Sequence, residues 1–239
     1  MEGCVFKIGQ WRYMASNRLG EEMAPRLFDV AALKAGGAKE CGGRGQALSF
    51  SLGGRGCFLR HYLRGGLWGR VMGDRFASFM PRAHRAFDEF SLLSWMRSEG
   101  LPVPQPVAAR ETGCAFIRQD IVVGRIEALD LSVVIARRLL TQEELSRLGM
   151  TIGRFFDAGI MHTDLNIRNI LLSESGDFYL IDFDKCFRTE MDSGKRQAVL
   201  DRLRRSFLKE IHRTAGKAHY NDTDFALIES KAMHHAGTV

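Results

Sequence analysis

The sequence predicts an α+β protein in which a β-rich N-terminal part precedes a mainly helical C-terminal part. Three observations predict this class. Residues 37–63 form a strand pattern interrupted by glycines, and residues 82–98 have helical periodicity. A second helical pattern starts at Thr141 and leads into a loop and a short hairpin that end at Asp182. We therefore expect two lobes, residues 1–123 and residues 124–239.

The composition is that of a globular protein without a membrane span. Hydrophobic residues make up 45% of the 239 residues and charged residues 26%. The longest apolar run, 131–140, is interrupted by Arg137 and Arg138, and the N-terminus lacks the apolar core of a signal peptide. The five cysteines are widely spaced without a C-x-x-C pair, so we expect reduced thiols and a cytosolic protein.

The net charge of +6 is concentrated in two segments. The segment from Arg55 to Arg85 contains seven arginines and one acidic residue. The segment from Lys195 to Lys217 contains eight lysines and arginines and two acidic residues. Such patches can bind nucleic acid, an anionic membrane or an anionic substrate. No zinc-finger or ribonucleoprotein motif is present, so no nucleic-acid partner is expected. Solvated faces without a ligand are the plain alternative.

The first strands are predicted around a glycine-rich segment. Strands at 47–52 and 57–59 flank a Gly53-Gly54 turn, and Gly43 and Gly45 precede them. Backbone amides of such a segment can surround phosphates, which makes Gly43 and Gly45 candidate ATP-binding residues. Glycines in plain hairpin turns are the alternative.

The helix at 82–98 carries an acid within its apolar side. At about 100° per residue, Glu89 falls inside the apolar stripe and Asp88 points away from it. The stripe consists of Ala83, Ala86, Phe87, Phe90, Leu93 and Met96. A buried carboxylate needs a cationic partner, and the preceding strand offers Arg60. The alternative is that Glu89 reaches solvent at the helix edge.

Three alternate prolines in 101–106 predict an extended segment. Residues 116–123 are predicted to form a strand that leads into the connection between the lobes near Gly124. Thr141 and Glu144 then form a capping box, which predicts a helix that Gly159 ends. This helix leads directly into a loop at His162.

The loop and hairpin carry the clearest chemical motif. Asp164 is followed five residues later by Asn169, and strands at 170–172 and 178–181 flank a polar turn before Asp182. An antiparallel hairpin brings Asn169 and Asp182 to the same end, where amide and carboxylate oxygens beside Asp164 suit Mg²⁺. The pattern H-x-D-L-x-x-x-N followed by D-F is the phosphoryl-transfer signature of kinases. An ordinary loop and a structural strand are the alternative.

Several phrases resemble one bacterial family. They are Leu59-Arg60-His61-Tyr62, Arg64-Gly65-Gly66-Leu67-Trp68-Gly69, Leu101-Pro102-Val103-Pro104, His162-Thr163-Asp164-Leu165-Asn166 and Ile181-Asp182-Phe183-Asp184-Lys185-Cys186. From about Gly42 to Glu210 the chain resembles the lipopolysaccharide kinase family, and within it the 3-deoxy-D-manno-octulosonic acid (Kdo) kinases. The resemblance implies a two-lobed protein-kinase-like fold with a reduced C-terminal lobe.

The resemblance also implies a reaction and residue roles. ATP would phosphorylate a hydroxyl of the Kdo sugar on a lipid A precursor, and the enzyme would be peripheral at the cytoplasmic side of the inner membrane. Asp164 would be the catalytic base, Asn169 and Asp182 the Mg²⁺ ligands, and Glu89 the helix carboxylate. Arg60 stands where most kinases have Lys, and it suits a fixed clamp because it stays charged and binds bidentately. Asp184 replaces the Gly of D-F-G, and Arg168 is a further departure that could affect acceptor contacts.

Two other readings compete. A kinase for another small molecule or for protein is one, although an arginine-rich site disfavours cationic aminoglycosides. A catalytically dead, kinase-like binding module is the other, and it predicts the loss of Asp164, Asn169 or Asp182, all of which are present.

The last predicted helix, 196–213, is basic. Its cations are interleaved with an apolar stripe of Leu200, Leu203, Phe207 and Ile211 and comprise Arg196, Arg202, Arg204, Arg205, Lys209 and Arg213. We expect electrostatic docking on an anionic surface, with the apolar side either exposed or packed on the C-terminal lobe.

Overall fold

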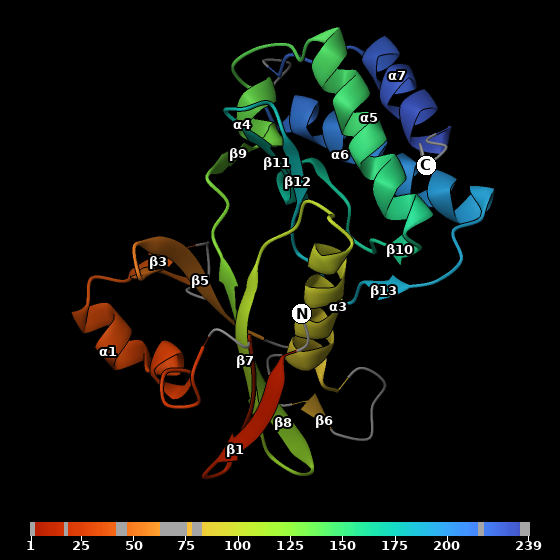
Figure 1. The fold of residues 1–239 in the computed structure, drawn as a ribbon. Helices are drawn as coiled ribbons and strands as arrows, with labels where there is room; N and C mark the ends of the chain where they lie inside the picture. The colour runs from red at the N-terminus through yellow and green to blue at the C-terminus, as the bar shows by residue number, and fades with distance from the viewer. Residues whose placement is uncertain are drawn as a thin grey trace. The chain divides into compact units, whose positions relative to one another are not determined.

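The computed structural model describes residues 3–16, 19–41, 47–62, 76–77, 83–214 and 218–234. The chain divides into two compact units, Met1–Gly100 with Pro104–Ile126, and Leu101–Val103 with Glu127–Val239. Strands dominate the first unit and helices the second, which confirms the predicted α+β class (Figure 1). The predicted lobe boundary, between residues 123 and 124, falls just before the end of the first unit at Ile126.

The first unit is built on one antiparallel sheet. Its strand order is β1-β2-β7-β8-β5-β4-β3, and β6 pairs with β8. The strands are β1 (Cys4–Ile8), β2 (Trp11–Ala15), β3 (Lys39–Cys41), β4 (Ala47–Leu52), β5 (Arg55–His61), β6 (Phe76–Ala77), β7 (Pro106–Thr112) and β8 (Phe116–Gly124). Gly53 and Gly54 have φ angles of 56° and 79°, which fit the two-residue turn of the predicted β4–β5 hairpin. The β1–β2 hairpin was not predicted.

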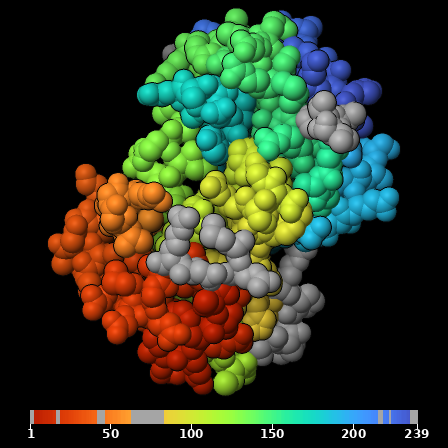
Figure 2. Space-filling view, viewed as in Figure 1, coloured from red at the N-terminus to blue at the C-terminus, as the bar shows by residue number. Residues whose placement is uncertain are grey.

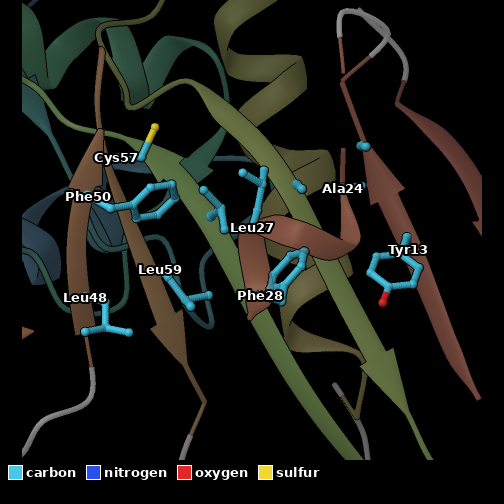
Figure 3. Packing of buried hydrophobic residues seen from close by; sticks show 11 residues of the cluster. Tyr13, Ala24, Leu27, Phe28, Leu48, Phe50, Cys57 and Leu59 are labelled. Atoms are coloured by element: carbon cyan, nitrogen blue, oxygen red, sulfur yellow. The ribbon is translucent and has the colours of Figure 1, made fainter. Parts of the chain in front are cut away.

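A hydrophobic cluster lies on one face of this sheet. The short helix η1 (Pro25–Phe28) and the helix α1 (Val30–Ala35) follow β2. In Figure 3, Leu27 and Phe28 of η1 lie between Phe50 and Leu59 on one side and Tyr13 on the other. The N-terminal segments, red and orange, also adjoin one another at the surface (Figure 2). Side chains of β4 and β5 belong to this cluster, and β5 also carries Arg60.

Helix α3 (Arg85–Ser98) packs on β7 and β8 (Figure 1). It begins at Arg85 instead of residue 82 because Gln119 of β8 holds its first turn. The Gln119 amide oxygen accepts from the N–H of Ala86 at 2.9 Å, and its nitrogen donates to the carbonyl of Ala83 at 3.1 Å. The predicted apolar stripe is buried, and Glu89 is buried with it while Asp88 is exposed.

The second unit combines helices with small sheets. Strands β12, β11 and β9 form one antiparallel sheet, and β10 pairs with β13. Its elements are β9 (Ala128–Asp130), α4 (Leu131–Ile135), α5 (Gln142–Asp157), β10 (Ile160–Met161), η2 (Ile167–Asn169), β11 (Ile170–Ser173), β12 (Phe178–Leu180), β13 (Phe187–Arg188), α6 (Ser193–Arg213) and α7 (Asp222–Met233). Of the helices in the described residues, none is both long enough and apolar enough to span a bilayer.

Helix α5 has the predicted capping box and lies beside α7 (Figure 1). The Thr141 hydroxyl accepts from the N–H of Glu144 at 3.1 Å, and the Glu144 carboxylate accepts from the N–H of Thr141 at 2.9 Å. A Cβ at Gly149 would lie 2.5 Å from the carbonyl oxygen of Ile228, so α7 can approach only because this residue is glycine.

Helix α6 starts at Ser193, where the Asp192 side chain accepts from the N–H of Lys195 at 2.8 Å. Leu200, Leu203 and Phe207 of its apolar stripe are buried and Ile211 is half-buried, and Phe207 packs against Tyr220 and Phe225. Of the two arrangements open to the predicted basic helix, the structure therefore has the one in which the apolar side packs on its own unit.

Candidate active site

The predicted hairpin is present and brings Asn169 and Asp182 to one end. β11 and β12 pair antiparallel, with Ile170 opposite Leu180. Beyond this pair, the N–H of Ile181 donates to the carbonyl of Asn169 at 3.0 Å. The hairpin thus extends to the residue before Asp182, as the sequence predicted.

Two amides fix the backbone at Asp164. The Nδ2 atoms of Asn166 and Asn169 both donate to the carbonyl oxygen of Asp164, each at 2.9 Å. The bond from Asn169 uses its amide nitrogen, which leaves the amide oxygen for a ligand. Asp164 and Asn169, five residues apart in the chain, are therefore in direct contact, and this contact places the amide oxygen of Asn169 beside the loop.

Asp182 has an unusual backbone conformation. Its φ angle is 65°, in the left-handed region that residues other than glycine rarely adopt. The next residue, Phe183, is buried and lies 5.9 Å from Phe155 and 4.9 Å from His162, measured between ring centroids. The buried ring holds the chain while the Asp182 carboxylate remains partly exposed, and strain of this kind is typical of functional sites.

His162 connects the loop to the end of the hairpin. Its Nε2 lies 3.1 Å from the carbonyl oxygen of Ile181, and its Nδ1 accepts from the N–H of Asp164 at 3.3 Å. Complete burial lowers the pKa of His162, which favours the neutral ring, with Nε2–H as donor and Nδ1 as acceptor. The histidine therefore positions Asp164 by hydrogen bonding without carrying charge.

The donor set at this end suits a hard cation. The amide oxygen of Asn169 and the carboxylate of Asp182 are the oxygen ligands that Mg²⁺ prefers. Within the described ranges there is no group of three or more His, Cys, Asp or Glu that could hold a metal. Asn169 and Asp182 are therefore the residues that would hold a hard cation such as Mg²⁺.

The first unit contains the predicted ion pair. Arg60 donates from Nη1 to Oε1 of Glu89 at 3.3 Å and from Nη2 to Oε2 at 3.1 Å. The Glu89 side chain is 2% exposed and that of Arg60 27%. The pairing of Arg60 with the buried Glu89 is therefore confirmed, and the roles of both residues toward ATP stay a prediction.

Tyr62 is a third member of this cluster that the sequence reasoning missed. Its hydroxyl donates to Oε2 of Glu89. Burial, and then the Glu89 carboxylate, raise the pKa of Tyr62 well above its usual range, so the hydroxyl remains a donor. The available signal was its position two residues after Arg60, on the same face of a strand. Gly43 and Gly45, the other candidate phosphate-binding residues, lie outside the described residues.

Helix α6 holds the Asp164 loop at three successive turns. Arg202 donates to the Asp164 carboxylate, with Nε 3.1 Å from Oδ1. The Ser206 hydroxyl accepts from the N–H of Ile167 at 3.1 Å, and Glu210 accepts from Arg168 at 3.2 Å. Residues 202, 206 and 210 are four apart and share one helix face. The sequence reasoning did not foresee these contacts.

Next to these contacts, α6 and the loop enclose a hollow of about 630 Å³. It is lined by Asp164, Asn166, Ile167, Arg168, Arg202, Arg205, Ser206, Lys209, Glu210 and Arg213. Five of these residues are cationic and two are acidic, so the hollow carries three excess positive charges. This charge favours an anionic ligand over a cationic one, and Asp164 lies in the wall of the hollow.

The six cations named for this helix from the sequence do not all face the hollow. Arg196 donates to Asp157 at 3.0 Å, and Arg204 lies over the ring of Phe225. At 100° per residue these two point away from the side shared by the other four, all of which line the hollow. Helical periodicity therefore places only four of the six cations at the hollow.

The fold and the site define the class of the protein. A helix leads to a His-x-Asp loop, an Asn contacts that Asp, and a hairpin ends in Asp-Phe, while the other unit pairs a strand cation with a helix Glu. This is the set of parts found in kinases.

The comparisons with known proteins agree. The model of the lipopolysaccharide kinase (Kdo/WaaP) family matches residues 29–226, and the chain belongs to this family. It is 44% identical over 161 residues to a 3-deoxy-D-manno-octulosonic acid kinase of Mannheimia succiniciproducens, covering 65% of this chain and 67% of that protein. It is 40% identical over 169 residues to one of Vibrio vulnificus, with 70% of each chain covered. The resemblance found in the sequence is thereby confirmed.

A third relative of the same name, from Haemophilus influenzae, is 42% identical over 165 residues, covering 66% of this chain and 68% of the relative. Among solved structures, WbdD in a co-crystal with the kinase inhibitor LY294002 has a TM-score of 0.47 and 15% identity. That match covers 80% of this chain and 44% of the other, a similarity too distant to define the fold.

Proposed function

We propose that the protein transfers the γ-phosphoryl group of ATP to a hydroxyl of the Kdo sugar on a lipid A precursor, a step in building the lipopolysaccharide inner core. The observation that carries this proposal is the loop in which Asn169 contacts Asp164 and a hairpin connects both to Asp182. The names of three relatives, each a 3-deoxy-D-manno-octulosonic acid kinase, support the choice of sugar.

Asp164 is the proposed base. As the sugar oxygen bonds to the γ-phosphorus, the bond from that phosphorus to the bridging oxygen of ADP breaks, and the hydroxyl proton passes to the Asp164 carboxylate. Three hydrogen bonds fix the backbone of this residue, from Asn166 and Asn169 and to His162. A fixed base is oriented without further cost in conformational entropy when the acceptor arrives.

Asn169 and Asp182 are the proposed ligands of Mg²⁺. When bound, the ion neutralises charge on the phosphate oxygens. Arg60 is the proposed cation for the ATP phosphates, because Glu89 holds its guanidinium in a bidentate pair while 27% of the side chain stays exposed. Gly43 and Gly45 are proposed to bind the phosphates through their backbone amides.

The test is a phosphotransfer assay with labelled ATP and defined acceptors. We expect Mg²⁺-dependent labelling of a lipid A precursor that bears Kdo, and none of the same precursor without Kdo. Asp182→Asn should abolish most turnover. Asp177→Asn is the matched control, because Asp177 lies in the turn at the opposite end of the same hairpin and should leave turnover unchanged.

Each competing function predicts a different result in this assay. A kinase for another small molecule would consume ATP but leave the Kdo-bearing precursor unlabelled. A binding module would bind the acceptor without consuming ATP. Labelling that does not require Kdo would contradict the proposed substrate.

We further propose that the enzyme is peripheral at the cytoplasmic face of the bacterial inner membrane, where its lipid acceptor is accessible. Cations near an anionic surface add about 1 kcal/mol each and are screened by salt. Co-sedimentation with anionic vesicles should therefore decrease steeply with salt and in the Arg204→Glu/Arg205→Glu double variant. Binding that is indifferent to both changes would contradict a role for α6 at the membrane.

A further inference from the structure

The proposed base is occupied by a side chain of its own unit. Two nitrogens of Arg202, Nε and Nη2, contact the same carboxylate oxygen, Oδ1 of Asp164. A base that receives a proton must present a lone pair, and a guanidinium on that oxygen competes with a substrate hydroxyl for it. Before Oδ1 can take up the proton in the proposed reaction, Arg202 has to release it.

The pair is one that can exchange. The side chains of Arg202 and Asp164 are 48% and 50% exposed. Exposed ion pairs contribute little to stability, so another anion can take the guanidinium at small cost. The neighbouring contacts are different, because Ser206 accepts from the backbone of Ile167 and the buried Glu210 holds Arg168. Release of Arg202 therefore leaves the loop attached to α6 at two other turns.

The hollow around the pair attracts anions. Arg205, Lys209 and Arg213 follow one another at intervals of four residues along α6 and line the hollow with Arg202. Glu210 binds Arg213 and Arg168, and the hydrogen bond from Arg213, followed by that from Arg168, lowers its pKa, so this acid stays ionised and the two arginines compensate its charge. Within the described chain, no acidic side chain forms an ion pair with Arg205 or Lys209.

We propose that Arg202 is a specificity-determining residue that moves from Asp164 to the carboxylate of the acceptor sugar, so that the base is released only when an acidic sugar is bound. This inference rests on the proposed function. A ligand shifts the equilibrium only by binding the arrangement with the released arginine more tightly, and a carboxylate does so more strongly than a neutral group. The planar guanidinium can bind a carboxylate with two parallel hydrogen bonds, which replace the two it gives up.

The sugar carboxylate is favoured over a lipid phosphate as the anion for Arg202. Asp164 must lie beside the hydroxyl that reacts, and Arg202 touches Asp164. A carboxylate on the same sugar ring is therefore within reach, whereas the phosphates of the lipid lie on other rings. Arg205 and Lys209 remain for those more distant charges.

The pair of Arg202 and Asp164 also affects the reaction of ATP with water. Without an acidic acceptor, Arg202 stays on Asp164 and Oδ1 is not available to activate a water molecule. The enzyme with ATP alone should therefore hydrolyse it slowly, and removal of Arg202 should raise this rate.

The experiment compares wild type and Arg202→Gln on three acceptors in detergent micelles. The acceptors are the Kdo-bearing precursor, its carboxyl methyl ester, and the precursor without its lipid phosphates. For wild type, esterification should reduce kcat/KM by about 10- to 100-fold, the range of a charge-assisted contact. For Arg202→Gln, esterification should reduce kcat/KM by less than about threefold. Hydrolysis of ATP without acceptor should increase in this variant.

Two further variants complete the design. Arg202→Lys keeps the charge without the planar fork, so its loss on esterification should be intermediate, and it replaces the Gln variant if that protein does not fold. Lys195→Gln removes a cation of the same helix that pairs with Asp192, two turns before Arg202, and should behave as wild type.

The outcomes separate this inference from the proposed function. Equal losses on esterification in wild type and Arg202→Gln would overturn the role of Arg202. An Arg202-dependent loss on removal of the lipid phosphates, and not on esterification, would also overturn it, since the anion would then be a phosphate. Failure of wild type to label the Kdo-bearing precursor would instead overturn the proposed function.

Discussion

The two units each contain an arginine–carboxylate pair, and the pairs differ in burial. In the first unit Glu89 is almost completely buried and also accepts a hydrogen bond from Tyr62. In the second unit Asp164 and Arg202 are each about half exposed. These two pairs therefore place the same chemistry in two environments, one inside the packed protein and the other at the wall of a cationic hollow.

The difference in burial separates structural from exchangeable pairs. A buried carboxylate that loses its cation remains uncompensated in a medium that solvates it poorly, so its partner cannot leave. An exposed carboxylate is rehydrated when its partner leaves, so the pair costs little to open. We infer that the pair in the first unit fixes a guanidinium for ATP, and that the pair in the second unit opens during the reaction.

The largest effect on stability is expected for the buried pair. Glu89→Gln should lower the free energy of unfolding by about 3 kcal/mol, the lower end for a broken buried pair, since Arg60 is 27% exposed. Arg202→Gln should change it by less than about 1 kcal/mol. Urea unfolding of both variants tests the comparison, and equal losses would contradict it.

A double-mutant cycle sharpens this result. If Arg60 and Glu89 act as one unit toward ATP, the double variant Arg60→Gln/Glu89→Gln should lose much less ATP affinity than the sum of the single variants. Titration calorimetry with ATP measures the four affinities. Strict additivity would show that the pair does not act as a unit on the nucleotide.

A smaller effect is expected for Tyr62→Phe. The change removes one hydrogen bond to a buried carboxylate and leaves the ring, so the free energy of unfolding should fall by about 1–3 kcal/mol. Tyr179→Phe is a control, because Tyr179 is only partly buried on β12. A loss no larger than that of the control would mean that Tyr62 does not support Glu89.

The smallest effect is a pH dependence from His162. Burial lowers its pKa in the folded state, so between that pKa and about 6.5 only the unfolded chain binds the proton. The stability that the neutral His162 contributes is complete above about pH 6.5 and is lost as the pH falls through the pKa of the folded state. Urea unfolding at pH 7.5 and 5.5 should show this loss in wild type and in the exposed control His234→Gln, but less in His162→Gln.

Local sequence patterns predicted much of this structure. The capping box at Thr141, the Gly53-Gly54 hairpin and the β11–β12 hairpin depend on residues close together in the chain, and all three are present. The pair of Arg60 and Glu89 could be predicted because an acid inside an apolar helix stripe requires a cation.

Contacts between distant segments were harder to predict. The hydrogen bonds between α6 and the loop join Asp164 to Arg202 and Ile167 to Ser206, and the residues of each pair are about 40 positions apart in the chain. The sequence shows that α6 is basic, but not which cations face the loop. The start of α3 likewise depends on Gln119 of β8, which is distant in the chain and which no local rule reveals.

The most direct test of the account is Asp164→Ala with two readouts on the same protein. We predict an unchanged free energy of unfolding within about 1 kcal/mol, because the carboxylate is half exposed. We also predict a loss of turnover on the Kdo-bearing precursor of about 10²- to 10⁴-fold, the contribution of a positioned base. A folded variant with near-wild-type turnover would contradict the account.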